Sequence, residues 1–110
     1  MAVLEWVISV DGVPIRLTDE RWAHITESHD YMAGHLELVL ETIGSPDKIA
    51  KGTHSAHIAV KKFDHTPLGR KYVTVVYRQG VKDGYVITAF MTSKPGKIFK
   101  KGVIWSRQEN

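Results

Sequence analysis

The sequence has no cysteine among its 110 residues. Disulfides and thiolate metal sites are therefore excluded, which fits a reducing compartment. It also lacks any apolar run near the ~18 residues that a membrane-spanning helix needs. No basic leader precedes the first apolar residues, and Glu5 interrupts them. From these absences we expect a cytoplasmic protein that does not associate with a membrane.

Each half of the chain is poor in charge of one sign. Residues 1–60 carry four Lys and Arg against nine acidic residues, a net charge of −5. Residues 61–110 carry eleven against three, a net charge of +8, and the two halves give the overall charge of +3. A basic second half suits an anionic partner, of which nucleic acid is the commonest. The alternative is a strand edge covered with lysines that prevents aggregation.

The first half contains the signals of a β-hairpin and two helices. Val3–Ser9 and Val13–Leu17 are apolar segments on either side of an Asp-Gly pair, which favours a tight turn. Thr18 is a typical helix N-cap, and the helix that it begins is expected to end near Asp30. Leu36–Ile43 predicts a second helix, because its apolar residues recur at helical spacing.

The second half changes to the two-residue alternation of β-strands, interrupted by turns that contain Gly and Pro. The expected strands are His57–Phe63, Lys71–Gln79, Tyr85–Ser93 and, from a weaker pattern, Ile98–Trp105. We therefore predict an α+β fold in which an N-terminal β-hairpin and two helices pack on a four-stranded antiparallel sheet. No repeat, linker or low-complexity segment divides the chain, so residues 1–110 are expected to form a single domain.

The two longest strands predict their own register. Their apolar residues share one face if Gly80 lies opposite Gly84, with the three residues between them as the loop. A two-residue turn at Asp83-Gly84 would instead drive polar side chains into the core. The predicted core face is Val73, Val75, Tyr77, Ile87, Ala89 and Met91. The opposite face would carry Tyr72, Thr74, Arg78, Thr88 and Thr92, a polar patch that either binds phosphate or simply contacts solvent.

The six histidines do not have the spacing of a metal site. His24, His29 and His35 are five and six positions apart, not the four that would stack two imidazoles on one helix face. His54 and His57 are three apart on a predicted strand, which directs them to opposite sides. We therefore expect no metal and no cofactor.

Histidine suits general acid–base chemistry, because its unperturbed pKa of about 6.5 lets it accept and donate protons near neutrality. At about 100° per helical residue, Trp22, Ile25 and His29 lie close together, whereas His24 lies away from Trp22. Either Trp22 anchors the core with His29 at its edge, or His24 faces the sheet. Both histidines are candidates, and the alternative for each is a partly buried surface position without chemistry.

Four segments occur in an order that resembles a known superfamily: Ile15–Ile25, with a Trp-x-His-Ile motif, Ser45–Ile49, Tyr72–Tyr77 and Tyr85–Phe90. Over about residues 15–93 they resemble small phage- and mobile-element-borne members of the barnase–EndoU–colicin–RelE superfamily of ribonucleases. The resemblance implies N-terminal helices on a four-stranded antiparallel sheet. It also implies metal-independent endoribonuclease activity, in which the RNA 2′-hydroxyl attacks the adjacent phosphate and leaves a cyclic phosphate end.

On this hypothesis His24 is the first candidate for general acid or base and His29 the second. Arg78 would hold the phosphate and Thr88 would hydrogen-bond one of its oxygens. Tyr72, Arg70 and Thr92 are the expected substrate-binding residues. RNA is the expected partner, whereas an inhibitor or antitoxin partner, a toxin or phage role and the oligomeric state stay open. The alternative function is a non-catalytic module that binds nucleic acid or a protein through the basic sheet face.

Overall fold

A computed structural model describes residues 1–108 of the protein. The helices are α1 (Asp19–Ser28) and α2 (Leu36–Gly44), with shorter 3-10 segments η1 (Asp30–Met32), η2 (Thr53–Ser55) and η3 (Pro95–Lys101). The strands are β1 (Val3–Ile8), β2 (Pro14–Thr18), β3 (Lys48–Lys51), β4 (His57–Phe63), β5 (Lys71–Gln79), β6 (Gly84–Thr92) and β7 (Val103–Ser106). No helix in this part of the chain has the length and apolar composition needed to cross a membrane.

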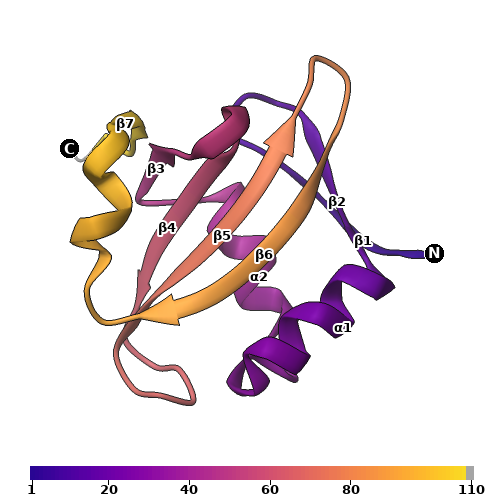
Figure 1. The fold of residues 1–110 in the computed structure, drawn as a ribbon, viewed down its shortest axis with the longest axis vertical. Helices are drawn as coiled ribbons and strands as arrows, with labels where there is room; N and C mark the ends of the chain where they lie inside the picture. Colours follow the sequence, from indigo (N-terminus) through magenta and orange to yellow (C-terminus); the bar gives the residue numbers. More distant parts are fainter. Residues whose placement is uncertain (109–110) are drawn as a thin grey trace.

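All strands of the described chain join one sheet, in the order β1-β2-β6-β5-β4-β3-β7 (Figure 1). The α+β class and the N-terminal hairpin are confirmed, but the predicted four-stranded antiparallel sheet is wrong, because this is a seven-stranded mixed sheet. The hairpin does not pack on the sheet but extends it: Ile15 and Arg16 of β2 pair in parallel with Gly84 and Tyr85 of β6. Parallel pairing between distant segments leaves no local pattern in the sequence, so the prediction missed it.

Only glycine fits where β2 joins β6. A Cβ atom on Gly84 would lie 2.7 Å from Cδ1 of Ile15 and even closer to the carbonyl oxygen of Arg78. The neighbouring strands therefore approach β6 more closely here than a side chain would allow. The pairing of β2 with β6, which adds the N-terminal hairpin to the sheet, therefore requires glycine at position 84.

The helix predictions are confirmed with small changes at the ends. Thr18 caps α1, since its Oγ1 accepts a hydrogen bond from the backbone N–H of Arg21 at 3.2 Å. The helix ends at Ser28, before the predicted Asp30, because His29 leaves the helical conformation with φ −136°. α2 spans its predicted residues and continues through Gly44.

α2 covers one face of the sheet, lying behind β5 and β6 in Figure 1. In the core, Ile25 of α1, Met32 of η1 and Val39 and Ile43 of α2 cluster with residues of the sheet that include Val73, Val75, Tyr77, Val86, Ala89 and Met91. The predicted core face of the hairpin is thus confirmed except for Ile87, which is only half-buried. Val86 is buried in its place.

A β-bulge explains the exchange. Val76 lies opposite Thr88, in the predicted register, but Tyr77 lies opposite Val86, so Ile87 is the extra residue. The predicted pairing of Gly80 with Gly84 is wrong: the backbone N–H of Gly80 donates to the carbonyl of Asp83 at 2.8 Å. The shorter turn puts the end of the hairpin out of phase, and the bulge restores the phase so that apolar residues face α2 along both strands.

The predicted C-terminal strand, Ile98–Trp105, is correct only in its second part. Residues 98–101 belong to the 3-10 segment η3, and the strand begins only at Val103, after Gly102 with φ +112°. β7 pairs with β3, a four-residue strand that the sequence pattern did not indicate. η3 lies beside β3, and the Lys48 ammonium sits 5.4 Å from the centre of the Phe99 ring.

Candidate nucleic-acid interface

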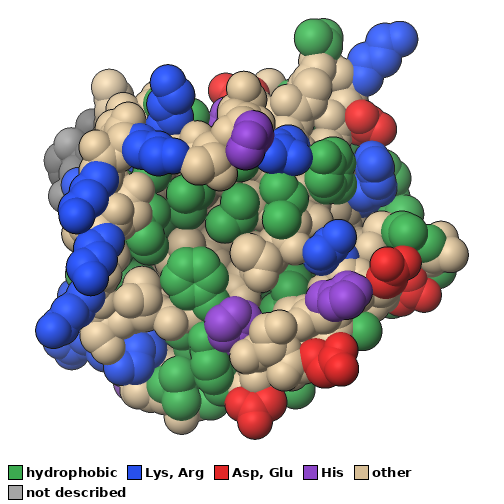
Figure 2. Space-filling view, in the orientation of Figure 1, with side chains coloured by type: hydrophobic (Ala, Val, Ile, Leu, Met, Phe, Trp, Pro, Cys, Tyr) green, Lys and Arg blue, Asp and Glu red, His purple; other side chains and the backbone are tan. Residues whose placement is uncertain are grey.

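The central strands have a second face, turned away from α2. Cross-strand pairing assigns its rows: Ile58, Val76 and Thr88 are neighbours, as are Val60, Thr74 and Phe90. We call this surface the open face; it consists of Ile58, Val60 and Lys62 of β4, Tyr72, Thr74, Val76 and Arg78 of β5, and Tyr85, Thr88, Phe90 and Thr92 of β6. Figure 2 looks onto it and shows uncharged side chains across its middle.

The open face lies between two flanking segments. α1 packs along β6 on one side, and η3 lies near β3 on the other (Figure 1). In Figure 2, Lys and Arg side chains gather along the η3 side, whereas histidine and acidic side chains lie on the α1 side. The lysines of and before η3 are Lys94, Lys97, Lys100 and Lys101, and none of them forms an ion pair within residues 1–108. The open face is therefore bordered by uncompensated positive charge.

His29 is held at the α1 edge of the open face. Its Nδ1 is 3.1 Å from the hydroxyl oxygen of Tyr31, which in turn accepts a hydrogen bond from the backbone N–H of Met91 at 3.2 Å. The His29 ring also lies 5.9 Å from the ring of Phe90, centre to centre. Because a hydroxyl can both donate and accept, Tyr31 can hold the imidazole in either protonation state. The other ring nitrogen, Nε2, has no partner in the described chain.

His24 lies elsewhere on α1. Its side chain is exposed and forms no hydrogen bond or ion pair with any residue that the structure describes. Ile25 is buried, and Trp22 is half-buried and packs against the core. Of the two arrangements that the sequence left open, the structure therefore shows the first: Trp22 anchors the helix, with His29 at the edge of the core.

Arg78 lies at the opposite end of the open face from Tyr72. Its Nε donates to the backbone carbonyl of His54 at 3.1 Å. His54 adopts a left-handed conformation, with φ 53°, so the η2 turn presents this carbonyl to the guanidinium. The two terminal amino groups of Arg78 have no partner in the described chain. An anchored guanidinium with two unoccupied nitrogen donors has the geometry that binds phosphate oxygens.

Thr88 lies between His29 and Arg78. It is two residues from Phe90 on the same side of β6, a spacing of about 7 Å. Tyr72 and Thr92 are cross-strand neighbours farther along the open face. The structure thus gathers His29, Thr88, Arg78, Tyr72 and Thr92 on one surface.

Arg70 is the predicted substrate-binding residue that the structure leaves outside this group. It lies in the turn between β4 and β5 and forms an exposed ion pair with Asp64, Nε to Oδ1 at 3.3 Å. Next to Arg78, by contrast, the structure adds a cation that the sequence reasoning missed. The Arg16 guanidinium lies 5.4 Å from the ring centre of Tyr85, the cross-strand neighbour of Arg78, and pairs with Asp83 at 3.2 Å.

Two aromatic residues at the site were also missed. Phe90 has the same strand parity as Thr88 and Thr92, and this parity was the signal that could have identified it. Tyr31 contacts His29 across a turn and the Met91 backbone across 60 residues, and no sequence signal indicates that contact.

Among residues 1–108, no three His, Asp or Glu side chains converge where they could hold a metal ion. No protein-family model, curated protein sequence or solved structure matches the chain. What the protein does is therefore inferred from the geometry of the open face.

Proposed function

We propose that this protein is a metal-independent endoribonuclease whose open face binds the RNA chain. One observation carries the proposal: a histidine oriented by Tyr31 and Phe90 lies on the same exposed surface as a hydroxyl and an anchored guanidinium. The sequence resemblance to the barnase–EndoU–colicin–RelE superfamily points to the same chemistry. The basic second half and the lysines around η3 supply the charge that an RNA backbone requires.

The proposed reaction needs two proton transfers and no cofactor. The 2′-hydroxyl of one nucleotide loses its proton while its oxygen bonds to the adjacent phosphorus. The bond from phosphorus to the 5′-oxygen of the next nucleotide breaks, and that oxygen takes up a proton. The products are a 2′,3′-cyclic phosphate and a 5′-hydroxyl end. We assign one of these two proton transfers to Nε2 of His29.

The remaining residues stabilise the phosphate. The terminal amino groups of Arg78 can bind two of its oxygens and offset the negative charge that develops as the 2′-oxygen attacks. The Thr88 hydroxyl, which lies between Arg78 and His29, can donate a hydrogen bond to one of the phosphate oxygens. We rank His24 second for proton transfer, because no neighbouring residue in the described chain orients its exposed side chain.

A second candidate function is a non-catalytic RNA-binding module. The observation that favours it is the group of lysines around η3 that form no ion pair within residues 1–108, because such cations can bind an anionic chain whether or not it is cleaved. Contacts to phosphate release counterions and give a binding constant that falls as salt rises. Replacing Lys97, Lys100 and Lys101 by serine should lower the slope of log K against log salt by about two for single-stranded RNA.

The test is incubation of the purified protein with total RNA and with a defined single-stranded RNA in excess EDTA, followed by sequencing of the ends. The proposal expects cleavage that survives chelation, with cyclic phosphate on one fragment and 5′-hydroxyl on the other. Salt-sensitive binding of intact RNA would support the second candidate instead. If the protein neither cleaves nor binds RNA, both candidate functions are contradicted.

A further inference from the structure

A pocket of about 870 Å³ lies at the end of the open face farthest from Arg78. It forms where η3 approaches the central strands, and its lining includes Val60 and Lys62 of β4, Tyr72 of β5, Lys48 of β3, Phe99 of η3 and Arg107 after β7. The volume lies within the range of about 300–1,000 Å³ that is typical of small-molecule sites. None of the residues proposed for proton transfer or for holding the reacting phosphate lines it.

Two aromatic side chains reach the pocket from different elements. Tyr72 comes from the sheet and Phe99 from η3. Both are half-buried, and the Tyr72 hydroxyl has no hydrogen-bond partner within residues 1–108. Exposed aromatic rings beside positive charge are the usual platforms for nucleic-acid bases, because every base has a flat face that can stack.

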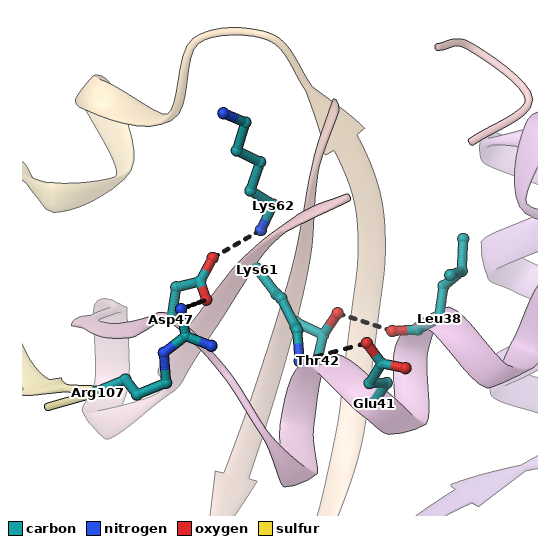
Figure 3. Close-up of polar contacts among 7 residues, drawn as sticks. All are labelled: Leu38, Glu41, Thr42, Asp47, Lys61, Lys62 and Arg107. Atoms are coloured by element: carbon teal, nitrogen blue, oxygen red, sulfur yellow. Dashed lines mark hydrogen bonds and ion pairs between the residues drawn. The ribbon is translucent and has the colours of Figure 1, made fainter. Parts of the chain in front are cut away.

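The carboxylates of the pocket are already engaged. Asp47 accepts the backbone N–H of Lys62 at 2.8 Å and pairs with Arg107 at 3.1 Å, as Figure 3 shows. Asp64 pairs with Arg70, so it does not neutralise a lysine of the pocket. Lys61, which also lines the pocket, pairs with Glu41 of α2 at 3.3 Å.

The pocket therefore keeps two uncompensated ammonium groups, those of Lys48 and Lys62, which have no carboxylate partner in the described chain. Figure 3 shows the Lys62 side chain extending away from the Asp47 carboxylate that binds its backbone. The Lys48 ammonium lies over Phe99, so one positive charge is fixed beside an aromatic ring. The pocket thus combines two aromatic rings with two ammonium groups that have no carboxylate partner within residues 1–108.

We propose that this pocket binds one nucleotide of the RNA, with its base against Tyr72 and Phe99 and its phosphate on Lys48 and Lys62. A nucleotide combines a flat ring with an anion, whereas an acidic peptide would use the lysines alone. The inference rests on the proposed function and extends it. Tyr72 is four residues along β5 from Val76, the neighbour of Thr88, a distance of about 13 Å. The bound nucleotide is therefore separate from the reacting phosphate, and it positions the RNA relative to the cleavage site.

The test begins with binding, which does not depend on cleavage. Each 5′-mononucleotide (AMP, GMP, CMP and UMP) is titrated into ¹⁵N-labelled protein while amide shifts are followed by NMR, with ribose 5-phosphate as the probe without a base. We expect the shifts to centre on Tyr72, Lys62 and Phe99, and ribose 5-phosphate to bind at least tenfold more weakly. Phe99→Leu, which keeps an apolar side chain but removes the ring, should weaken nucleotide binding to a similar extent.

A matched lysine pair serves as the control. Lys62→Ser should weaken nucleotide binding several-fold, whereas Lys82→Ser, in the exposed turn between β5 and β6, should leave it unchanged. Equal binding of ribose 5-phosphate and the nucleotides, or shifts that leave Tyr72 and Phe99 unmoved, would overturn the proposal. Circular dichroism of each variant checks that it is folded.

A second arm separates this proposal from the endoribonuclease itself. A short RNA should compete with the mononucleotide for the pocket, and Phe99→Leu should change where that RNA is cut. Mononucleotide binding without RNA competition would overturn the RNA subsite. RNA competition without cleavage would keep the subsite and remove the nuclease. Cleavage at an unchanged position in Phe99→Leu would keep the nuclease and remove the subsite.

Discussion

The two faces of β5 differ in burial, although they are built from alternating residues of one strand. Toward α2, Val73, Val75 and Tyr77 are each 0% exposed and pack in the core. On the open face, Tyr72 and Arg78 are half-buried, at the two ends of a surface that no helix covers. The first face is explained by burial of apolar area, at roughly 25 cal/mol per Å².

The composition of the open face does not follow from packing. Thr74 is fully buried there, and its Oγ1 has no hydrogen-bond partner within residues 1–108, which is a cost to stability. At the borders of the open face, His29 is held by the Tyr31 hydroxyl and Arg78 by the His54 carbonyl. Nε2 of His29 and the terminal amino groups of Arg78 have no partner within residues 1–108. An unsatisfied buried group such as the Thr74 hydroxyl is a departure from good packing, and such departures are typical of functional sites. The same strands therefore supply the core with one face and the candidate site with the other.

The largest expected effect is loss of cleavage in His29→Ala. General acid–base catalysis contributes about 10²–10⁴-fold, so the single-turnover rate on a defined RNA should fall on that scale while the fold is kept. His65→Ala, in the exposed turn between β4 and β5, is the matched control and should retain the wild-type rate. A greater loss in His24→Ala than in His29→Ala would move the proton transfer to the outer surface of α1.

Gly84→Ala should have the largest effect on stability. Its Cβ would collide with the Arg78 carbonyl and with Ile15, so the backbone must shift. Overpacking of this kind typically costs about 1–3 kcal/mol, measurable as a lower midpoint in urea. Gly96→Ala is the control, since a Cβ there meets nothing within 4 Å. Equal midpoints for the two variants would show that β2 and β6 are not joined as the structure has them.

A pair of isosteric substitutions tests the two faces directly. Val75→Thr puts a hydroxyl without a partner into the helix-covered core and should cost about 1–3 kcal/mol of unfolding free energy. Thr74→Val removes a buried hydroxyl that has no partner in the part of the chain that the structure describes, so it should be neutral or stabilise by up to about 1 kcal/mol. Chemical denaturation of both variants gives the comparison. A larger destabilisation in Thr74→Val than in Val75→Thr would contradict it.

At neutral pH the smallest effect is expected at Tyr77, where the effect appears only at high pH. Burial, with a smaller contribution from Asp11, raises the pKa of Tyr77 from 10.0 to about 12. The unfolded chain loses this proton near pH 10 and the native protein near pH 12, so the free energy of unfolding falls as pH rises between them. Tyr77→Phe has no hydroxyl to ionise, so its free energy of unfolding lacks this decrease. At pH 7 it should be as stable as the wild type or slightly more stable, because the buried hydroxyl has no hydrogen-bond partner within residues 1–108, and its advantage should grow from pH 10 to 12. Parallel stability curves would refute the shift.

The local elements were largely predictable from the sequence. The Thr18 cap, the apolar spacing of α2 and the two-residue alternation of β4 and β5 are set by neighbours along the chain. The short strand β3 was missed because four residues are too few to show a period. The 3-10 segment η3 was misread as a strand, because residues 98–101 lack a pattern that separates the two.

The candidate site was predictable only in part. Thr88, Thr92 and Arg78 were placed on one face because side chains alternate along a strand, and the cross-strand pairs agree. Which helical histidine meets that face could not be derived, because it depends on how α1 packs against β6. The Tyr31 contact, which links residues 29, 31 and 91, has no trace in the sequence.

The sequence by itself determined where the chain turns, which residues alternate and that its second half is basic. Only the tertiary structure decided that β2 joins β6, that a bulge at Ile87 restores the phase of the hairpin, and that η3 closes a pocket beside Tyr72. The reason is physical. Turn, cap and periodicity preferences act between residues a few positions apart. The choice of strand partner and the walls of a pocket depend on contacts between distant segments that compete for the same surfaces.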